Sequence, residues 1–344
     1  MQIVIFVFLT ALALTAFSTP LVRRFSIWIG FVDIPAGRKL HKEPMPLMGG
    51  VAIFGGAIIA LLALFSILPK SFNISAPQVI GMILASGIVA LVGLVDDRRN
   101  LPASAKLAGQ MVGFLILYFF GIQVRLQLPD LLNLVITFLW LAGISNAINC
   151  LDNMDGLSAG VSGVVAAFIL LLAIFNGQYL VASLSAAILG ACLGFLRYNF
   201  HPAKIFMGDA GALFLGFLLA VLGLQLRFPN NVNAVTWMVP VFILGLPIFD
   251  TSLVVVSRLR RRVNPFTTAG KDHVSHRLVE LGFSQREAVL ILYLITGAFG
   301  MIGLFVANAA IVEAYFVGAT VALLGLVAIW RLEWRRRHII RESG

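Results

Sequence analysis

Charged residues are scarce in this chain, and cysteine is nearly absent. Only 12% of its 344 residues are charged while 60% are hydrophobic, and the two cysteines are Cys150 and Cys192. So little charge, with a mean hydropathy of +0.99, excludes a pair of soluble domains and is typical of a polytopic membrane protein. The cysteines lie in or beside apolar runs, so they offer no disulfide framework. We therefore expect one membrane-embedded domain over residues 1–344.

A cleavable leader is not indicated, because no lysine or arginine precedes the first apolar run and Arg23 and Arg24 follow it. We expect a first membrane span here. A helix needs about 20 residues to cross the hydrocarbon core of a bilayer. Eleven apolar windows approach that length, at 2–22, 47–68, 77–95, 105–121, 130–149, 157–175, 179–196, 210–226, 235–256, 287–307 and 310–330. The sequence thus predicts an all-α protein with about eleven transmembrane helices and its termini on opposite sides.

Lysine and arginine are nearly absent from one side of these predicted spans. Of the 25 basic residues, the exceptions on that side are Lys70, Arg125 and Arg227. The positive-inside rule makes the basic side cytoplasmic, with the N-terminus outside and the C-terminus inside. All but two of the 15 acidic residues also gather on or near the basic face. Since the rule makes no such demand on acids, we expect a cytoplasmic active site in a multi-pass protein of the plasma membrane.

A polar stretch interrupts the apolar sequence between the fifth and sixth windows. Asn146, Asn149, Asp152 and Asp155 recur there at about every third residue. On a helix or a tight helical turn this spacing places all four on one side. Polar groups withdrawn from water are costly unless they are paired, so such a cluster indicates a functional site. The alternative is a polar loop in which Asp152 and Asp155 cap the next helix.

Two further carboxylate motifs stand at the ends of predicted spans. Asp96 and Asp97 directly follow the third window. Neighbouring side chains on a helix point about 100° apart, so one can bind metal while the other holds a proton or a lysine. A solvated pair beside Arg98 is the alternative. Asp209 directly precedes the eighth window and lies between Gly208 and Gly211. It is either an N-cap or a magnesium ligand beside a phosphate-binding loop. In the second case Phe206 is free to stack on a base.

Two basic loops accompany these acids. The loop at 257–286 carries an arginine run, which is an anchor on the positive side, and then His273, His276 and Arg277. Zinc binding by this histidine pair is disfavoured, because no cysteine lies nearby and the remaining acids suit a hard ion. The second loop carries Lys42 among prolines and glycines. Clustered acids, cations and glycine turns on one face suit magnesium-assisted phosphoryl transfer between a nucleotide and a lipid.

These motifs, in this order, resemble those of the polyprenyl-phosphate N-acetylhexosamine-1-phosphate transferases over about residues 33–283. Asp96-Asp97 looks like the aspartate pair of that family, 149–156 like its Asn-x-x-Asp-x-x-Asp-Gly element, and 206–209 like its metal-binding element. The resemblance implies transfer of a sugar 1-phosphate, most simply that of N-acetylglucosamine (GlcNAc), from a UDP-sugar to undecaprenyl phosphate with release of UMP. This reaction is the first membrane step of cell-envelope polysaccharide synthesis at the inner membrane.

The resemblance also implies roles for single residues. Asp209 would be the main magnesium ligand, Asp96 would receive the polyprenyl phosphate, and Asp97 would support the metal and the phosphates. The substrate-binding residues would be Asp152, Asn199 and Phe206 at the uridine, Asn149 and Asp155 closing the same pocket, His273, His276 and Arg277 at the pyrophosphate and sugar, and Lys42 at the mouth. Mg²⁺ would be the cofactor, with Mn²⁺ as its substitute. The UDP-sugar, the lipid and the membrane are the expected partners, without nucleic acid, and a homodimer is left open.

Two departures bear on the branch of the family. The aspartate pair lacks the lysine three residues later that the pentapeptide translocases carry, and Ser275 stands where the family commonly has a histidine. Both favour the UDP-GlcNAc branch over the alternative, the phospho-MurNAc-pentapeptide transferases of peptidoglycan synthesis. A transporter is the remote alternative, but transporters place their charges near the membrane midplane. A CDP-alcohol phosphatidyltransferase is disfavoured because Asp155-Gly156 is not followed closely by Ala-Arg.

Overall fold

The protein is almost entirely helical, as the apolar windows predict. The computed structural model describes residues 1–34, 44–67, 76–265 and 270–342. Eight helices in this described part are long and apolar enough to cross a membrane. They are α1 (Gln2–Trp28), α3 (Ala76–Arg99), α5 (Asp130–Cys150), α6 (Leu157–Phe175), α7 (Tyr179–Asn199), α8 (Gly208–Gln225), α13 (Gln285–Asn308) and α14 (Ile311–Glu342). The chain is thus a multi-pass membrane protein.

The remaining three windows form shorter or broken helices, so the expected count of eleven spans stays a prediction. The second and fourth windows become α2 (Gly49–Ile67) and α4 (Ala103–Phe119). The ninth window breaks into α9 (Asn233–Thr236), α10 (Met238–Ile243) and α11 (Gly245–Arg260), with a bend of 72° at Leu244. Pro247 explains the break, because it lacks the N–H that would continue the helical ladder to the Ile243 carbonyl.

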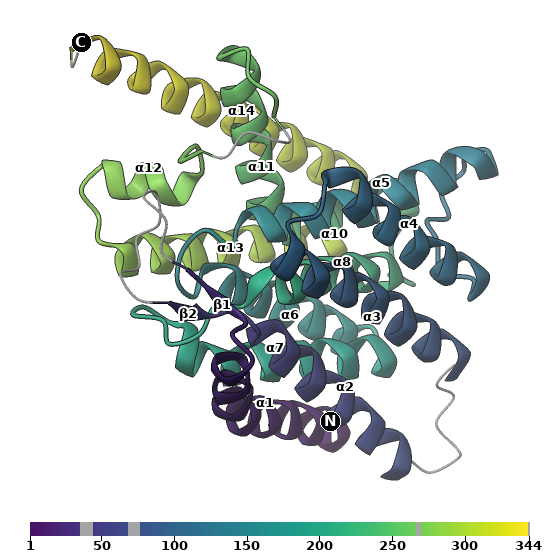
Figure 1. The fold of residues 1–344 in the computed structure, drawn as a ribbon. Coiled ribbons are helices and arrows are strands. Elements are labelled where there is room, and N and C mark those ends of the chain that lie inside the picture. The colour runs from purple at the N-terminus through teal and green to yellow at the C-terminus, as the bar shows by residue number, and fades with distance from the viewer. Residues whose placement is uncertain (35–43, 68–75, 266–269, 343–344) are drawn as a thin grey trace.

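Helix α8 occupies the middle of the bundle and α14 its edge (Figure 1). Within their most apolar windows, 83% of α8 is buried inside the protein and only 6% of α14. Helix α3 packs closely on α8 because Gly93 has no side chain: a Cβ atom there would lie 2.5 Å from the Asp209 carbonyl oxygen. This approach fixes the end of α3 against the start of α8.

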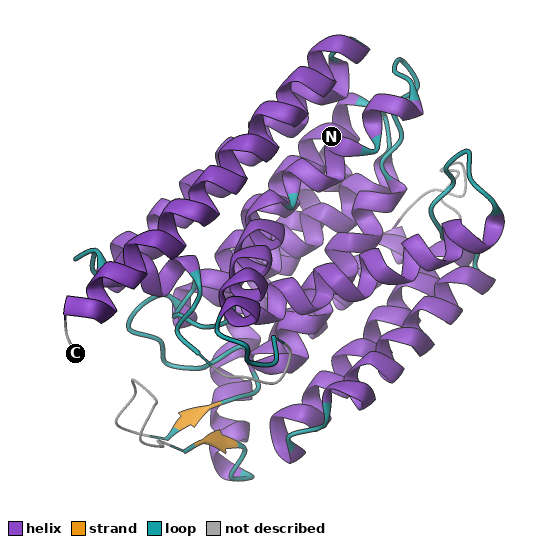
Figure 2. Cartoon of the chain, turned by 90° about the horizontal axis from the view of Figure 1, so that it is seen from above, coloured by secondary structure: helices purple, strands orange, loops and turns teal. Residues whose placement is uncertain are grey.

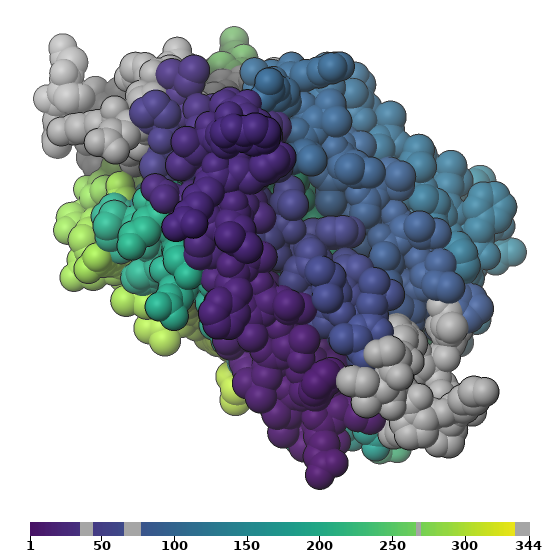
Figure 3. Space-filling view, turned by 60° about the horizontal axis from the view of Figure 1, so that its bottom comes forward, coloured from purple at the N-terminus to yellow at the C-terminus, as the bar shows by residue number. Residues whose placement is uncertain are grey.

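Helix α1 runs along the outside of the bundle (Figure 3). It packs on α2 and α7 through small and β-branched residues such as Ala11 and Thr15. Its opposite face exposes large apolar side chains, among them Phe17 and Trp28. A face of that kind is expected to contact lipid, since apolar side chains in the bilayer need no protein cover.

A small two-stranded sheet stands at one end of the helices (Figure 2). Strands β1 (Val32–Asp33) and β2 (Met45–Pro46) pair antiparallel, with Val32 opposite Pro46. The Pro46 carbonyl also accepts a hydrogen bond from the Phe206 amide at 2.8 Å. The short helix α12 (Val274–Glu280) lies at the same end, against the start of α13. Most of the sequence motifs meet at this end, where α3, α5, α7 and α11 finish and α8 begins.

Candidate active site

The two carboxylates that end α3 point in different directions, as their adjacency on a helix requires. Asp96 is buried, and its Oδ1 accepts a hydrogen bond from the Leu101 amide at 2.6 Å. Asp97 instead accepts hydrogen bonds from the Asp209 amide at 2.8 Å and the Ala210 amide at 3.1 Å. Asp97 therefore satisfies the free N–H groups at the start of α8, a stabilising place for a negative charge.

Lys106, on α4, joins Asp96 to Asp209. Its Nζ lies 2.7 Å from Asp96 Oδ2 and 3.1 Å from Asp209 Oδ2. Asp209 is the more accessible of the two acids, with 31% of its side chain exposed against 7% for Asp96. The cluster thus places one cation between two carboxylates and leaves one carboxylate open to a substrate. The sequence analysis missed Lys106, which follows the aspartate pair after a turn at Pro102.

Gly208 allows α8 to begin beside Asp97. Its φ is +73°, a backbone conformation that residues with side chains rarely adopt. A Cβ atom at this position would lie 2.6 Å from Asp97 Oδ2. The glycine ahead of Asp209 is therefore required twice, by its backbone conformation and by the approach of the carboxylate.

The polar stretch at 149–156 forms the last turn of α5 and a tight turn before α6. The Asn149 Nδ2 atom is buried and has no hydrogen-bond partner among the described residues. The Asp152 carboxylate accepts no hydrogen bond that the described part of the chain provides, although the Asp152 amide bonds to the Asn149 carbonyl at 3.0 Å. Burial, and then the charges of Asp209 and Asp155, raise the pKa of Asp152 to about 8. Unsatisfied groups of this kind favour a ligand site.

Asp155 and Asn199 hold the loop that leads to α8. Asp155 Oδ2 lies 2.8 Å from His201 Nδ1 and accepts a hydrogen bond from the Ala203 amide at 3.0 Å. Asn199 is buried, accepts a hydrogen bond from the Gly156 amide at 3.0 Å and donates one to the Ile205 carbonyl at 2.9 Å. These contacts use both ends of the Asn199 amide to tie the turn to the loop, and its uridine contact stays a prediction.

Phe206 is half-buried and its backbone extends the small sheet. Its amide bonds to the Pro46 carbonyl, and its carbonyl accepts a hydrogen bond from the Gly49 amide at 3.0 Å. The main chain is thereby fixed three residues before Asp209. The structure is compatible with a stacking role for the ring, which stays a prediction. Lys42, predicted at the mouth of the pocket, lies outside the described residues.

The histidine motif is attached to the buried Asp250 of α11. Asp250 Oδ2 lies 2.7 Å from His273 Nδ1, and Asp250 Oδ1 accepts a hydrogen bond from the Val274 amide at 2.7 Å. His273 and His276 have ring centroids 6.2 Å apart. Burial lowers the pKa of His276, and the positive charges of His273 and Lys271 lower it further. His276 is therefore expected to be neutral at pH 7.

Ser275 connects this motif to the polar stretch. Its Oγ donates a hydrogen bond to Asn153 Oδ1 at 2.6 Å, and Asn153 Nδ2 donates one to the Cys150 carbonyl at 2.8 Å. The departure noted at Ser275 therefore has a structural use. It fixes α12 against the turn that carries Asn149 and Asp152.

Arg277 is held by α14. Its guanidinium forms an ion pair with the buried Glu333 and a hydrogen bond from Nε to the Asp272 carbonyl at 3.0 Å. Its buried Nη1 atom has no hydrogen-bond partner among the described residues. Asp272 in turn lies 2.6 Å from an Arg261 nitrogen. Two of the three guanidinium nitrogens of Arg277 are thus engaged within the protein, while Nη1 has no partner among the described residues, and its pyrophosphate contact stays a prediction.

The comparisons with known proteins cover nearly the whole chain. The model of glycosyl transferase family 4 matches residues 79–227, which include the aspartate pair, the polar stretch and Asp209. A Bacillus subtilis protein named probable undecaprenyl-phosphate N-acetylglucosaminyl 1-phosphate transferase is 36% identical over 91% of this chain and 88% of its own length. The chain belongs to the polyprenyl-phosphate N-acetylhexosamine-1-phosphate transferases of glycosyl transferase family 4.

Two other members of family 4 show how the branches compare. A decaprenyl-phosphate N-acetylglucosaminephosphotransferase of Mycolicibacterium smegmatis is 32% identical over 93% of this chain and 85% of its own length. A phospho-N-acetylmuramoyl-pentapeptide-transferase of Anoxybacillus flavithermus is 30% identical over 87% of this chain and 95% of its own length. The pentapeptide branch is thus similar but more distant, as the sequence departures predicted.

Proposed function

We propose that this chain transfers N-acetylglucosamine 1-phosphate from UDP-N-acetylglucosamine to a polyprenyl phosphate. An oxygen of the lipid phosphate attacks the phosphorus that carries the sugar, the bond from this phosphorus to the bridging oxygen breaks, and UMP leaves with that oxygen. The product is a polyprenyl diphosphate sugar. Family membership and the names of the two GlcNAc relatives support the proposal. The lipid acceptor is undecaprenyl phosphate, as in the Bacillus subtilis relative's name.

The Asp96, Lys106 and Asp209 cluster carries this proposal. A phosphate monoester has a second pKa near 6, so it is largely dianionic at neutral pH and needs no base to attack. The Lys106 ammonium, held between the two carboxylates, is a point charge that can bind a phosphate oxygen. Asp96 then positions the acceptor through Lys106.

Magnesium is the proposed cofactor, with manganese as its substitute. No group of three His, Cys, Asp or Glu suited to a metal occurs among the described residues. Mg²⁺ is nevertheless commonly bound by one or two carboxylates together with substrate phosphates. The partly exposed Asp209 supplies such a carboxylate. Asp209 would hold the ion, supported by Asp97, whose oxygens keep further lone pairs beside their two backbone partners. The bound ion would neutralise charge on the donor diphosphate.

The uridine and sugar would lie over the neighbouring turn. Asn149 offers an unpartnered amide nitrogen and Asp152 an unpartnered carboxyl group among the described residues. The raised pKa of Asp152 favours its protonated form, which can donate a hydrogen bond to a uracil carbonyl. Phe206 would stack on the base, and His276 would reach the sugar or the pyrophosphate.

The decisive assay measures release of UMP by the purified chain. UMP should appear from UDP-N-acetylglucosamine only when undecaprenyl phosphate and Mg²⁺ are both present. UDP-MurNAc-pentapeptide is the competing donor, since a pentapeptide transferase is among the relatives. Turnover of the pentapeptide donor alone would assign the chain to that branch, and UMP release without lipid would exclude a transferase of this kind.

The site is proposed to face the cytoplasm, with the N-terminus outside the cell and the C-terminus inside. The distribution of lysine and arginine supports this orientation. An Arg335→Cys variant tests it, because a membrane-impermeant thiol reagent should label that position only after the cells are opened. A matched Asp130→Cys variant, at the opposite end of the helices, should be labelled in intact cells. The reverse pattern would invert the orientation.

A further inference from the structure

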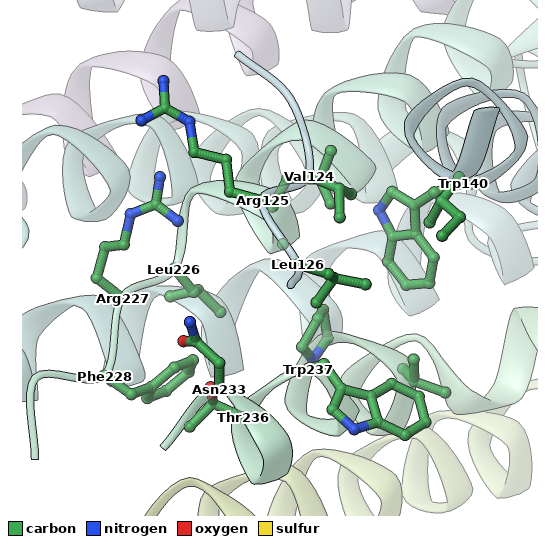
Figure 4. Close-up of a pocket in the computed structure, with 15 residues that line it drawn as sticks. Val124, Arg125, Leu126, Trp140, Leu226, Arg227, Phe228, Asn233, Thr236 and Trp237 are labelled. Atoms are coloured by element: carbon green, nitrogen blue, oxygen red, sulfur yellow. The ribbon is translucent and has the colours of Figure 1, made fainter. Parts of the chain in front are cut away.

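Figure 4 shows the residues that line a cavity, whose volume is about 280 Å³. They come from α5 and the segment before it, the end of α8, α9 and α10, at the other end of the helices from Asp96 and Asp209. Helix α5 begins at this end with Asp130 and finishes at the candidate active site, while α8 begins at that site and finishes here. The 18 residues of α8 span about 27 Å at 1.5 Å per residue. The cavity is therefore separate from the active site and opens at the opposite membrane face.

The walls of this cavity are mainly apolar and include two tryptophans. Trp140 comes from α5, and Trp237 stands between α9 and α10. Each indole nitrogen already has a partner within the protein: Trp140 Nε1 donates to the Ala220 carbonyl at 3.0 Å and Trp237 Nε1 to the Ala234 carbonyl at 3.0 Å. The two rings thus present apolar surface, of the kind that aromatic side chains contribute near membrane interfaces.

Two arginines stand at one side of the same cavity. Arg125 and Arg227 extend their guanidinium groups in the same direction (Figure 4). Neither guanidinium has a hydrogen bond or an ion pair with the residues that the structure describes. Gln178 fixes the Arg227 backbone, donating to its carbonyl at 2.7 Å and accepting from its amide at 3.0 Å. The fold thus places both arginines without a partner for their charge among the described residues.

Both arginines are exposed at one side of the cavity, where two neighbouring positive charges favour a bound anion. Partial burial lowers the pKa of Arg227, and the charge of Arg125 lowers it further. The fifteen lining residues include no acid. At the same end, Asp130 begins α5, and Glu313 accepts a hydrogen bond from the Ala310 amide at 3.1 Å. Two like charges brought together over an apolar cavity are stabilised by a bound anion, and the arginine fork matches phosphate oxygens.

We propose that this cavity binds an anionic phospholipid of the membrane leaflet opposite the active site. Arg125 and Arg227 hold the headgroup phosphate, and the cavity between Trp140 and Trp237 takes the upper part of one acyl chain. The volume is just below the roughly 300–1,000 Å³ of drug-sized ligand pockets, so a whole lipid does not fit inside and most of both chains stays in the bilayer. Basic pockets between transmembrane helices bind anionic headgroups on the cytoplasmic side of membranes, and the same chemistry would act here in the opposite leaflet.

Native mass spectrometry on the full-length chain in detergent tests the proposal. Phosphatidylglycerol should bind at least tenfold more tightly than phosphatidylcholine. The double variant Arg125→Gln/Arg227→Gln should lose this preference, because its affinity for phosphatidylglycerol should fall much further than its affinity for phosphatidylcholine. The matched control is Arg24→Gln/Arg331→Gln, which removes two exposed arginines elsewhere and should keep the preference. Equal binding of both lipids by the unmodified chain, or equal loss in the control, would overturn the proposal.

Two further measurements separate the remaining outcomes. Phosphatidylglycerol with brominated acyl chains should quench tryptophan fluorescence, and a Trp237→Phe variant should show less quenching; unchanged quenching would place the acyl chain elsewhere. Inorganic phosphate at millimolar concentration should not displace the lipid, and displacement would mean a site for a free anion. Thermal melting without lipid shows whether the double variant is folded. A variant that melts early is replaced by Arg125→Lys/Arg227→Lys, which keeps the charge and should bind with an intermediate affinity.

Discussion

Lys106 and Asp96 form an ion pair of 2.7 Å between the start of α4 and the end of α3, and the same ammonium lies 3.1 Å from Asp209. Replacing Lys106 by Gln should therefore leave two carboxylates facing each other and remove the cation that we propose binds the lipid phosphate. We expect kcat for UMP release to fall by about 10² to 10³, the loss typical of a main electrostatic stabiliser. Arg99→Gln, an exposed cation on the same turn of α3, is the control and should retain near-normal turnover. Turnover within twofold of normal in Lys106→Gln would remove it from the site.

Asp209→Asn should abolish turnover by weakening magnesium binding, since this ion requires charged oxygen ligands. A loss of about a hundredfold or more is expected, and raising the Mg²⁺ concentration should restore part of the rate. Asp130→Asn, which neutralises an acid at the opposite end of the helices, should leave the magnesium dependence unchanged. Near-normal turnover of Asp209→Asn at low Mg²⁺ would contradict the assignment.

Asn199→Ala distinguishes a structural role from a substrate contact. The variant leaves the Gly156 amide and the Ile205 carbonyl without their partner, and each unsatisfied buried group costs about 1–3 kcal/mol. We expect a lower melting temperature in the absence of ligand. A normal melting temperature with weaker UDP binding would instead support the predicted uridine contact.

Phe206 is expected to stack on the uracil ring. Phe206→Ala should then weaken binding of UDP by about 1–3 kcal/mol, the effect of removing an aromatic partner from a base, while Phe206→Trp should bind nearly as well. Calorimetry for UDP and melting without ligand would be measured for both variants. If the ring is part of the core, Phe206→Ala should instead melt earlier and Phe206→Trp should overpack.

His276 should make the free energy of unfolding depend on pH. Its pKa is lowered in the folded chain, so between that value and the ordinary pKa near 6.5 the unfolded chain binds more protons. The free energy of unfolding should therefore fall as the pH drops below about 6.5. His276→Gln should show a weaker fall over the same range, measured by melting at pH 7.0 and 5.5. Parallel curves for both chains would mean that His276 does not carry the effect.

The sequence predicted the helices better than their meeting points. All eleven apolar windows contain helix, and hydropathy cannot reveal that Pro247 breaks the ninth. Asp96, Asp97 and Asp209 were brought together by the family resemblance, because their positions at span ends alone left a solvated pair and an N-cap as alternatives. Lys106 was missed because a single lysine near the start of an apolar helix is the ordinary anchor of the positive side. Its role depends on the α3 to α4 turn, which composition does not show.

The hydrogen-bond and ion-pair partners of the other predicted residues could not be predicted from the sequence either. Asp155 was placed in the substrate pocket, and the structure shows it bound to His201 and Ala203. The spacing of Asp155 predicted the side of the turn on which its side chain lies. It could not predict whether a protein loop or a substrate contacts that side. Glu333, which holds Arg277, lies on α14 far along the chain, and a lone acid in a terminal helix carries no recognisable pattern.

Gly93 and Asp97 join the catalytic end of the chain to its most buried helix, α8. Asp209 cannot separate from Asp97 without pulling the first turn of α8 out of the middle of the bundle. Heat inactivation should therefore be abrupt, with turnover and tertiary structure disappearing at one temperature instead of activity fading first. Backbone amides at the start of α8 should correspondingly exchange with deuterium as slowly as those at its centre, whereas amides in the little-buried part of α14 should exchange sooner.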